Sequence, residues 1–280
     1  MSDPIATCLA GALSPELAIA QCLLQGDSPA TLGTRVQRAR TDTAAWYALD
    51  RICADTDRIA RLQHMIAVAG VEHAAPRDPG SIALLFDRAV AVSPEASVAL
   101  YSLGDPARLD LATSEVIEWL VSETWLRPGM DVLDLGCGIG RLIPATAQVA
   151  RSVIGLDVSA GMIAEARHRC AGLPNLRLEV GSGRDLAGIA DRSLDLVLAV
   201  DSLPYVVQAG LADVLAAEIA RALRPRGAWV ILNLAYDCAP DAEKATIAAW
   251  CDRFHFAPRR LGVTPFRHWD ARGFVVERLD

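Results

Sequence analysis

Hydrophobic and polar residues follow two different patterns along the chain, and the change falls near residue 105. Before it, apolar residues recur at helical spacing, as at Ile52, Ile59, Leu62 and Ile66, with Asp and Arg between them. Ser-Pro pairs at 14–15, 28–29 and 93–94 are typical of helix starts, because the hydroxyl caps the first turn and proline fits its first position. We therefore predict that residues 1–105 are wholly helical.

After residue 105 a long helix is expected up to about Trp125, and from Asp131 short apolar segments alternate with amphipathic ones. This alternation predicts a parallel α/β sheet. Strands are expected near 131–135, 153–157, 176–180, 194–201 and 228–235, followed by extended segments near 258–267 and 273–279. Helices are expected near 140–150, 160–171, 211–223 and 241–253.

Composition and charge narrow the classes of protein that fit. No apolar run approaches the roughly 20 residues of a membrane helix, and the start Met1-Ser2-Asp3-Pro4 lacks the basic residues of a secretory signal. We expect a cytoplasmic protein with no membrane partner. A net charge of -7, with no basic cluster beyond Arg259-Arg260, argues against a nucleic-acid partner.

Cysteine and lysine usage add two expectations. The seven cysteines are scattered and form no Cys-x-x-Cys pair, so reduced thiols are favoured over disulfides, and no metal site is expected. Basic residues are almost all arginine, with Lys244 the only lysine, which indicates a GC-rich bacterial source.

The most informative segment joins the first expected strand to the helix after it. Asp134 stands two residues before a Gly-x-Gly-x-Gly loop formed by Gly136, Gly138 and Gly140. Glycines are needed where the backbone turns sharply and approaches a ligand closely. The dinucleotide fingerprint has its third glycine one residue later, where this chain has Arg141, and an acid here would repel a pyrophosphate.

Further acids follow the next three strands. Asp157 lies 17 residues after Gly140, where a carboxylate can accept both hydroxyls of a ribose or cap the helix near Ser159. Asp185 lies in the segment Gly181–Leu186 after the third strand, which also fits ordinary turn chemistry. The fourth strand ends at Asp201.

These features, in this order, resemble the class I S-adenosyl-L-methionine (SAM)-dependent methyltransferases over roughly residues 105–280. The segment Leu223–Gly227 resembles the family's Leu-x-Pro-Gly-Gly turn, with Arg226 in place of the first glycine. The resemblance implies a seven-stranded, mostly parallel, doubly wound α/β sheet of order 3-2-1-4-5-7-6, with the last strand antiparallel. It also implies a SAM-binding domain over 106–280, preceded by a helical lid or dimerisation region over 1–105 that is expected to make a homodimer.

The resemblance also implies which residues bind SAM. Asp134 would lie near the ammonium group, Asp157 at the ribose, Asp185 at the adenine amino group and Asp201 beside the sulfonium. The complete expected set is Asp134, Gly136, Cys137, Gly138, Gly140, Asp157, Val158, Met162, Gly183, Arg184, Asp185 and Asp201.

Catalytic residues are harder to predict, because much of the barrier to methyl transfer falls through positioning alone, and a base is needed only if the acceptor must lose a proton. Strand-end position favours Asp201 and Tyr205. His255 and His268 are the only histidines of the C-terminal segment, where such enzymes often build substrate pockets.

The function expected is methyl transfer to an oxygen or nitrogen of a small molecule or peptide natural product. The fourth strand does not continue as Asn-Pro-Pro-Tyr, the motif of enzymes that methylate amino groups of nucleic acids. Two other functions stay open. The first is a SAM-fold protein with a binding, regulatory or pericyclic role. The second is a nicotinamide-dependent oxidoreductase.

Overall fold

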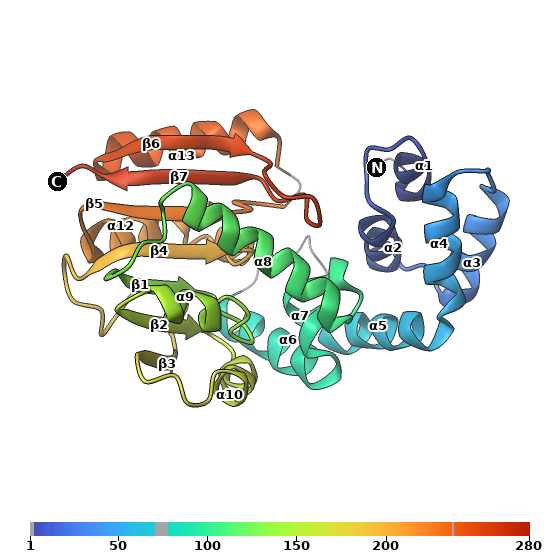
Figure 1. The fold of residues 1–280 in the computed structure, drawn as a ribbon, viewed down its shortest axis with the longest axis horizontal. Coiled ribbons are helices and arrows are strands. Elements are labelled where there is room, and N and C mark those ends of the chain that lie inside the picture. Colours follow the sequence, from blue (N-terminus) through green and yellow to red (C-terminus); the bar gives the residue numbers. More distant parts are fainter. Residues whose placement is uncertain (1–2, 71–77, 237) are drawn as a thin grey trace. The chain divides into compact units, whose positions relative to one another are not determined.

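The computed structural model describes residues 3–70, 78–236 and 238–280. Two compact units make up the chain. The first combines residues 1–73 and 85–111, and the second combines 74–84 and 112–280 (Figure 1). Helices α6 (Pro79–Val92) and α8 (Pro106–Ser122) each contribute residues to both units. The expected division between residues 105 and 106 stays a prediction.

Helices fill the described part of the first unit, as predicted. Ser14, Ser28 and Thr43 cap their helices by accepting the backbone N–H of the residue three positions later. The helices of this unit, besides the parts of α6 and α8, are α1 (Pro4–Leu9), α2 (Pro15–Leu24), α3 (Pro29–Arg38), α4 (Ala44–Ala54), α5 (Thr56–Ala69), α7 (Pro94–Val98) and the 3-10 turn η1 (Leu100–Ser102).

The apolar faces of these helices form a core of their own. Ile19, Leu32 and Leu49 are fully buried in it, and Leu62 is 1% exposed. The helices therefore bury their apolar faces within one chain, so their burial does not require a second copy. The expected homodimer stays a prediction.

A seven-stranded sheet forms the second unit, and its order, β3-β2-β1-β4-β5-β7-β6, confirms the predicted topology. The first five strands in the chain run parallel, while β7 is antiparallel to both β5 and β6. The strands are β1 (Asp131–Leu135), β2 (Ser152–Asp157), β3 (Leu176–Val180), β4 (Leu194–Val200), β5 (Leu223–Leu232), β6 (Phe256–Val263) and β7 (Gly273–Arg278).

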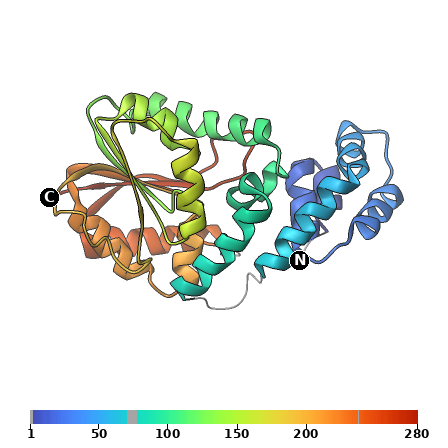
Figure 2. The ribbon, with the colours of Figure 1, turned by 90° about the horizontal axis from the view of Figure 1, so that it is seen from below.

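Helices cover both faces of this sheet (Figure 2). Besides its parts of α6 and α8, the unit holds α9 (Ile143–Val149), α10 (Ala160–Arg169), α11 (Leu203–Gln208), α12 (Ala212–Ala222) and α13 (Pro240–Phe254). Trp229 on β5 is completely buried and stacks on Trp250 of α13, with ring centroids 5.3 Å apart. The sole lysine, Lys244, lies on the exposed side of α13 and pairs with Asp241 at 3.5 Å.

Two local features differ from the sequence-based expectation. Strand β5 begins at Leu223 rather than near residue 228, because Leu223 pairs with Leu194 of β4 before an irregularity in the register. The short helix α11, directly after β4, was not expected. Among the described residues, no helix is long and apolar enough to cross a membrane.

Candidate functional site

The carboxyl ends of the five parallel strands meet at one edge of the sheet, and most of the expected site residues lie there. Parallel α/β sheets bind their ligands at this edge. At its centre, the backbone N–H groups of Gly136 and Cys137 both donate to the carbonyl of Leu156, at 2.7 and 3.0 Å. These bonds fix the start of the glycine loop to strand β2.

Gly136 must be glycine in this arrangement. Its φ is +72°, a conformation that L side chains rarely adopt, and a Cβ would lie 2.3 Å from the Cβ of Ser202. The Ser202 hydroxyl in turn donates to the carbonyl of Leu135 at 2.7 Å. The end of β4 is thereby joined closely to the end of β1.

Asp157 joins the glycine loop to the start of α10. Its Oδ2 accepts the backbone N–H of Gly138 at 2.9 Å, and its Oδ1 accepts that of Ser159 at 2.9 Å. The side-chain cap of α10 is Ser159, whose hydroxyl accepts the N–H of Met162 at 3.0 Å. Asp157 therefore organises the loop. Its expected contact with a ribose stays a prediction.

The third glycine and the loop cysteine serve packing. A Cβ on Gly140 would lie 2.9 Å from the sulfur of Cys170, so the loop and α10 approach closely here. Cys137 is 6% exposed, and burial raises the pKa of its thiol well above the ordinary value. A buried, protonated thiol is a poor nucleophile, so the backbone of Cys137 is the part that the loop uses.

Asp134 is a buried acid within the first strand of the sheet. It is 3% exposed, and burial raises the pKa of its carboxyl to about 7, with the charge of Asp157 adding to the rise and that of Arg141 opposing it. A buried carboxylate is costly unless a cation compensates it. This position therefore suits a cationic ligand group.

Asp185 lies in a hydrogen-bonded turn on the surface. It accepts the Ser182 hydroxyl at 2.9 Å and the N–H of Ala187 at 3.2 Å, through Oδ1 in both cases. Nearby, Gly183 has a φ of +69°, and a Cβ there would lie 2.7 Å from Val158. The turn interpretation of Asp185 is thus seen directly, and its expected contact with adenine stays a prediction, as does a role for the exposed Arg184.

Asp201 is held rigidly at the end of β4. Its φ is +61°, and its N–H donates to the carbonyl of Leu232 at 2.8 Å. Its Oδ1 accepts two bonds at 2.9 Å, from the amide of Asn233 and from the hydroxyl of Tyr236. Burial raises the pKa of this carboxyl, while the two donors and Arg141 oppose the rise.

Asn233 is itself fixed from the other side. Its amide oxygen accepts the N–H of Arg272 at 3.1 Å, and its own N–H donates to the carbonyl of Arg272 at 2.9 Å. These bonds determine which way the amide points, so that its NH₂ group is directed at Asp201. Its φ of +63° is the second left-handed strand end at this edge, and such strained residues cluster at functional sites.

Aromatic side chains lie near Asp201 and its hydrogen-bond donors. Tyr205 packs edge-on against Tyr236, with ring centroids 5.8 Å apart. Trp269, from the loop between β6 and β7, is 4% exposed, and the guanidinium carbon of Arg141 lies 5.4 Å from the centre of its ring. Arg141 thus reaches from the residue after the glycine loop to this aromatic side chain.

The two expected histidines lie in different places. His268 belongs to the β6–β7 loop, at the same edge as Asp201, where its Nδ1 lies 2.8 Å from Glu115 of α8. His255 caps the C-terminus of α13, next to Phe256, which pairs with Arg278. That is the amino end of β5, at the opposite edge of the sheet, so His255 lies apart from the other expected site residues.

The sequence-based prediction missed Arg141, Asn233, Tyr236 and Trp269. Asn233 and Tyr236 directly follow the fifth strand, so strand-end position, which singled out Asp201, would have found them. Trp269 had no such signal, because its loop approaches the site only through the antiparallel pairing of β7 with β5. In the described part of the chain, no group of three or more His, Cys, Asp or Glu side chains is placed to hold a metal ion.

Part of the chain is similar to known methyltransferases. Residues 132–227 match the family described as methyltransferase domain. The demethylmenaquinone methyltransferase of Symbiobacterium thermophilum is 36% identical over 125 residues, which are 40% of this chain and 46% of the relative. The nocamycin O-methyltransferase of Saccharothrix syringae is 42% identical over 108 residues, which are 36% of each chain.

Among solved structures, the magnesium protoporphyrin IX methyltransferase of Synechocystis, crystallised with SAM, is 25% identical. The alignment covers 61% of this chain and 80% of that one, with a TM-score of 0.48. The chain spans about a third to a half of the length of the curated relatives it matches, between 30% and 54% for the first of them.

Proposed function

Because this chain carries a domain of the class I SAM-dependent methyltransferase family, we propose that it transfers the methyl group of SAM to an oxygen or nitrogen of a small-molecule or peptide natural product. The observation that carries the proposal is the glycine loop bound to Asp157 beside the buried Asp134. The name of the nocamycin relative supports oxygen as the acceptor atom.

The residues at this edge fit SAM. A cationic amino-acid group would compensate the buried Asp134. The close contact between Gly136 and Ser202 keeps the glycine loop against the end of β4 beside that acid. We assign Asp134 to the ammonium group, the loop backbone to the amino-acid part and Asp157 to the ribose. Bound SAM supplies an electrophilic methyl group, and the chain must position the acceptor behind it.

We assign to Asp201 the role of the base that removes the proton of the methyl acceptor. Both hydrogen bonds that its side chain accepts from described residues fall on Oδ1, and none of those residues donates to Oδ2. Oδ2 is therefore available to accept an O–H or N–H of the acceptor and take its proton as the new bond to carbon forms. Because burial raises the pKa of Asp201 above its ordinary value, the group is a stronger base than an exposed carboxylate.

Calorimetric titration with S-adenosylhomocysteine (SAH), alongside NADH, tests the cofactor assignment. We expect saturable binding of SAH alone. Asp157→Ala should weaken SAH binding by about 1.5–3 kcal/mol, the range for lost charge-assisted hydrogen bonds. Asp241→Ala, which changes a fully exposed acid of α13, is the control. Wild-type affinity in the Asp157 variant, or binding of NADH alone, would contradict the proposal.

Turnover tests the role of Asp201. The purified protein is incubated with SAM and a panel of hydroxylated and amino-bearing small molecules, and SAH is quantified by mass spectrometry. For any acceptor found, Asp201→Asn should lower kcat by about 100-fold or more and remove the acidic limb of the pH profile. An unchanged pH profile would exclude Asp201 as the proton acceptor.

A further inference from the structure

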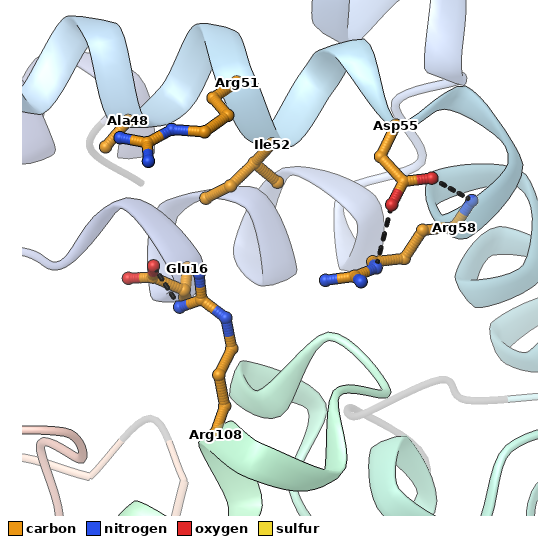
Figure 3. Close-up of a pocket in the computed structure, with 7 residues that line it drawn as sticks. All are labelled: Glu16, Ala48, Arg51, Ile52, Asp55, Arg58 and Arg108. Atoms are coloured by element: carbon orange, nitrogen blue, oxygen red, sulfur yellow. Dashed lines mark hydrogen bonds and ion pairs between the residues drawn. The ribbon is translucent and has the colours of Figure 1, made fainter.

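The first unit contains a pocket lined largely by charged side chains, which the proposed function does not use. The pocket is a cavity of about 250 Å³ lined by Glu16, Ala48, Arg51, Ile52, Asp55, Arg58 and Arg108 (Figure 3). These residues come from helices α2, α4 and α5 and from the start of α8, and all of them belong to the first unit.

Three guanidinium groups face two carboxylates in this pocket. Arg108 forms an ion pair with Glu16, and Arg58 forms one with Asp55 at 3.1 Å (Figure 3). Arg58 and Arg108 also lie 3.5 and 3.6 Å from the same oxygen of Asp105, just outside the lining. The acids hold two of the guanidinium groups in place. The side chains of Arg58 and Arg108 nevertheless stay 36% and 38% exposed.

Asp55 and Asp105 have a second structural role, helix capping, which the arginines lack. Oδ1 of Asp55 accepts the N–H of Arg58 at 3.1 Å and Oδ1 of Asp105 accepts that of Ala107 at 3.0 Å, so both acids cap their helices. Arg58 and Arg108 stand in the first turns of those helices, where the helix dipole disfavours a cation. Helix capping therefore accounts for Asp55 and Asp105, whereas Arg58 and Arg108 contribute to the structure through their ion pairs alone.

Arg51 differs from the other two arginines. It lies in the last turn of α4, is exposed, and makes no hydrogen bond or ion pair with any residue that the structure describes. In Figure 3 its side chain extends along the pocket beside Ala48, next to the aliphatic side chain of Ile52. The guanidinium of Arg51 is thus available to bind a ligand in a pocket whose lining also includes the aliphatic side chain of Ile52.

We propose that this pocket binds a small organic anion, whose carboxylate or phosphate group is held by Arg51 with support from Arg58 and Arg108, and whose short apolar part contacts Ile52. A guanidinium binds such oxyanions through two parallel hydrogen bonds, which an ammonium group cannot do. The site lies wholly within the helical unit and does not rest on the methyltransferase proposal.

Calorimetric titration of the full chain with glutarate and with inorganic phosphate, each against chloride at equal ionic strength, tests the site. We expect saturable binding of at least one of the two anions; glutarate alone would indicate a carboxylate ligand, and phosphate alone a phosphate ligand. Arg51→Ala should weaken the binding about tenfold, and Arg51→Lys should restore it only in part.

Arg38→Ala is the matched control, since Arg38 is an exposed arginine in the last turn of α3 that does not line the pocket. This variant should bind the anion within about twofold of wild type. Binding of neither anion above chloride, or an equal loss in the Arg38 and Arg51 variants, would overturn the proposal. A parallel SAH titration separates this result from the cofactor assignment, because Arg51→Ala should leave SAH affinity unchanged.

Discussion

The buried carboxyl of Asp134 links stability to pH. Its folded pKa of about 7 is above the ordinary value because burial disfavours the charged form. Folding is therefore favoured most below the unfolded pKa of about 4, and this contribution is lost as the pH rises toward 7. At neutral pH and above, the ligand-free protein carries the full cost of a buried charge.

Asp134→Asn should remove this cost. We expect the variant to gain about 2–4 kcal/mol in free energy of unfolding at about pH 8, and about half of that at about pH 5.5. Urea unfolding of the ligand-free protein at both pH values measures the difference. The same variant should bind SAH more weakly, and a gain that does not change with pH would contradict the raised pKa.

Gly136 and Gly188 separate steric from conformational requirements. Both have positive φ, +72° and +87°, but a Cβ on Gly136 meets Ser202 at 2.3 Å, whereas one on Gly188 has nothing within 4 Å. Gly188→Ala should therefore cost about 1 kcal/mol of stability and leave SAH binding intact. Gly136→Ala should cost more and weaken SAH binding, as thermal unfolding and calorimetry would show. Equal effects of the two substitutions would contradict the close packing at Ser202.

At this scale the sequence predicted the acids well and their partners poorly. Asp134 and Asp157 lie in the last two residues of β1 and β2, Asp201 directly follows β4, and the structure brings all three to one edge. The bonds from Asn233 and Tyr236 to Asp201 span 32 and 35 residues and depend on how β5 lies beside β4. No local pattern encodes such a contact.

Among the elements, the loop between β6 and β7 is attached to α8 by the carboxylate of Glu115 and by an aromatic contact. Glu115 accepts the N–H groups of Arg267 and His268 at 3.0 Å each, and its other oxygen lies 2.8 Å from Nδ1 of His268. Phe266 packs between Trp119 of α8 and Trp269, with both ring centroids 5.8 Å away. This loop carries Trp269 to the site, so Glu115 positions a wall of that site indirectly.

Glu115→Gln should loosen the loop, because the charge-assisted bonds to two backbone N–H groups become weaker. We expect faster hydrogen exchange over residues 264–270, by about tenfold, while the strands beside the loop are unaffected. Glu118→Gln, an exposed acid one turn along the same helix, is the control and should exchange like wild type.

The same attachment should weaken in acid. Burial would raise the pKa of Glu115, but the bonds from His268 and Arg267 outweigh it and keep the pKa below its ordinary value. A carboxyl of this kind stabilises the folded loop above its unfolded pKa of about 4.3, and the contribution is lost as the pH falls through the lower folded value. Protection of the loop amides, relative to their intrinsic exchange rates, that stayed constant below about pH 4 would contradict this.

Elements were predictable where periodicity and strand-end signals were strong. The strands 131–135 and 176–180 have the expected bounds, because apolar runs bounded by turn residues specify them. Helix α11 was missed because its six residues give too short a pattern to detect. Arg226 adopts a φ of +66°, which explains why the family has a glycine where this chain has arginine.

At the scale of the whole molecule, the chain has two separate hydrophobic cores. A substitution in one core should therefore change stability without changing cofactor binding in the other unit. Leu32 is fully buried in the first unit, whereas every residue assigned to SAM belongs to the second. Leu32→Ala should lose about 2–5 kcal/mol of stability through the cavity it leaves, with SAH affinity within about twofold of wild type. Loss of SAH binding in a variant with native circular dichroism would show that the helical unit helps to form the site.

At this scale the order of the strands followed from the family resemblance, and the structure confirms it. The expected division between residues 105 and 106 stays a prediction. The helical first third and the α/β remainder were evident from the change in periodicity. The contributions of α6 and α8 to both units were not, because a helix's own sequence does not show which core its two ends join.

Lys244 gives the molecule a single side chain for amine-directed chemistry. It is the sole lysine, its side chain is 47% exposed, and it lies on α13 rather than at the proposed cofactor site or in the arginine-lined pocket. With the α-amino group first acylated near neutral pH, where the lysine amine is protonated, a dye or biotin coupled to Lys244 at high pH would mark one defined point of the fold. Fluorescence or surface-binding assays with acceptor panels would then have a reporter at a known place, without an introduced cysteine.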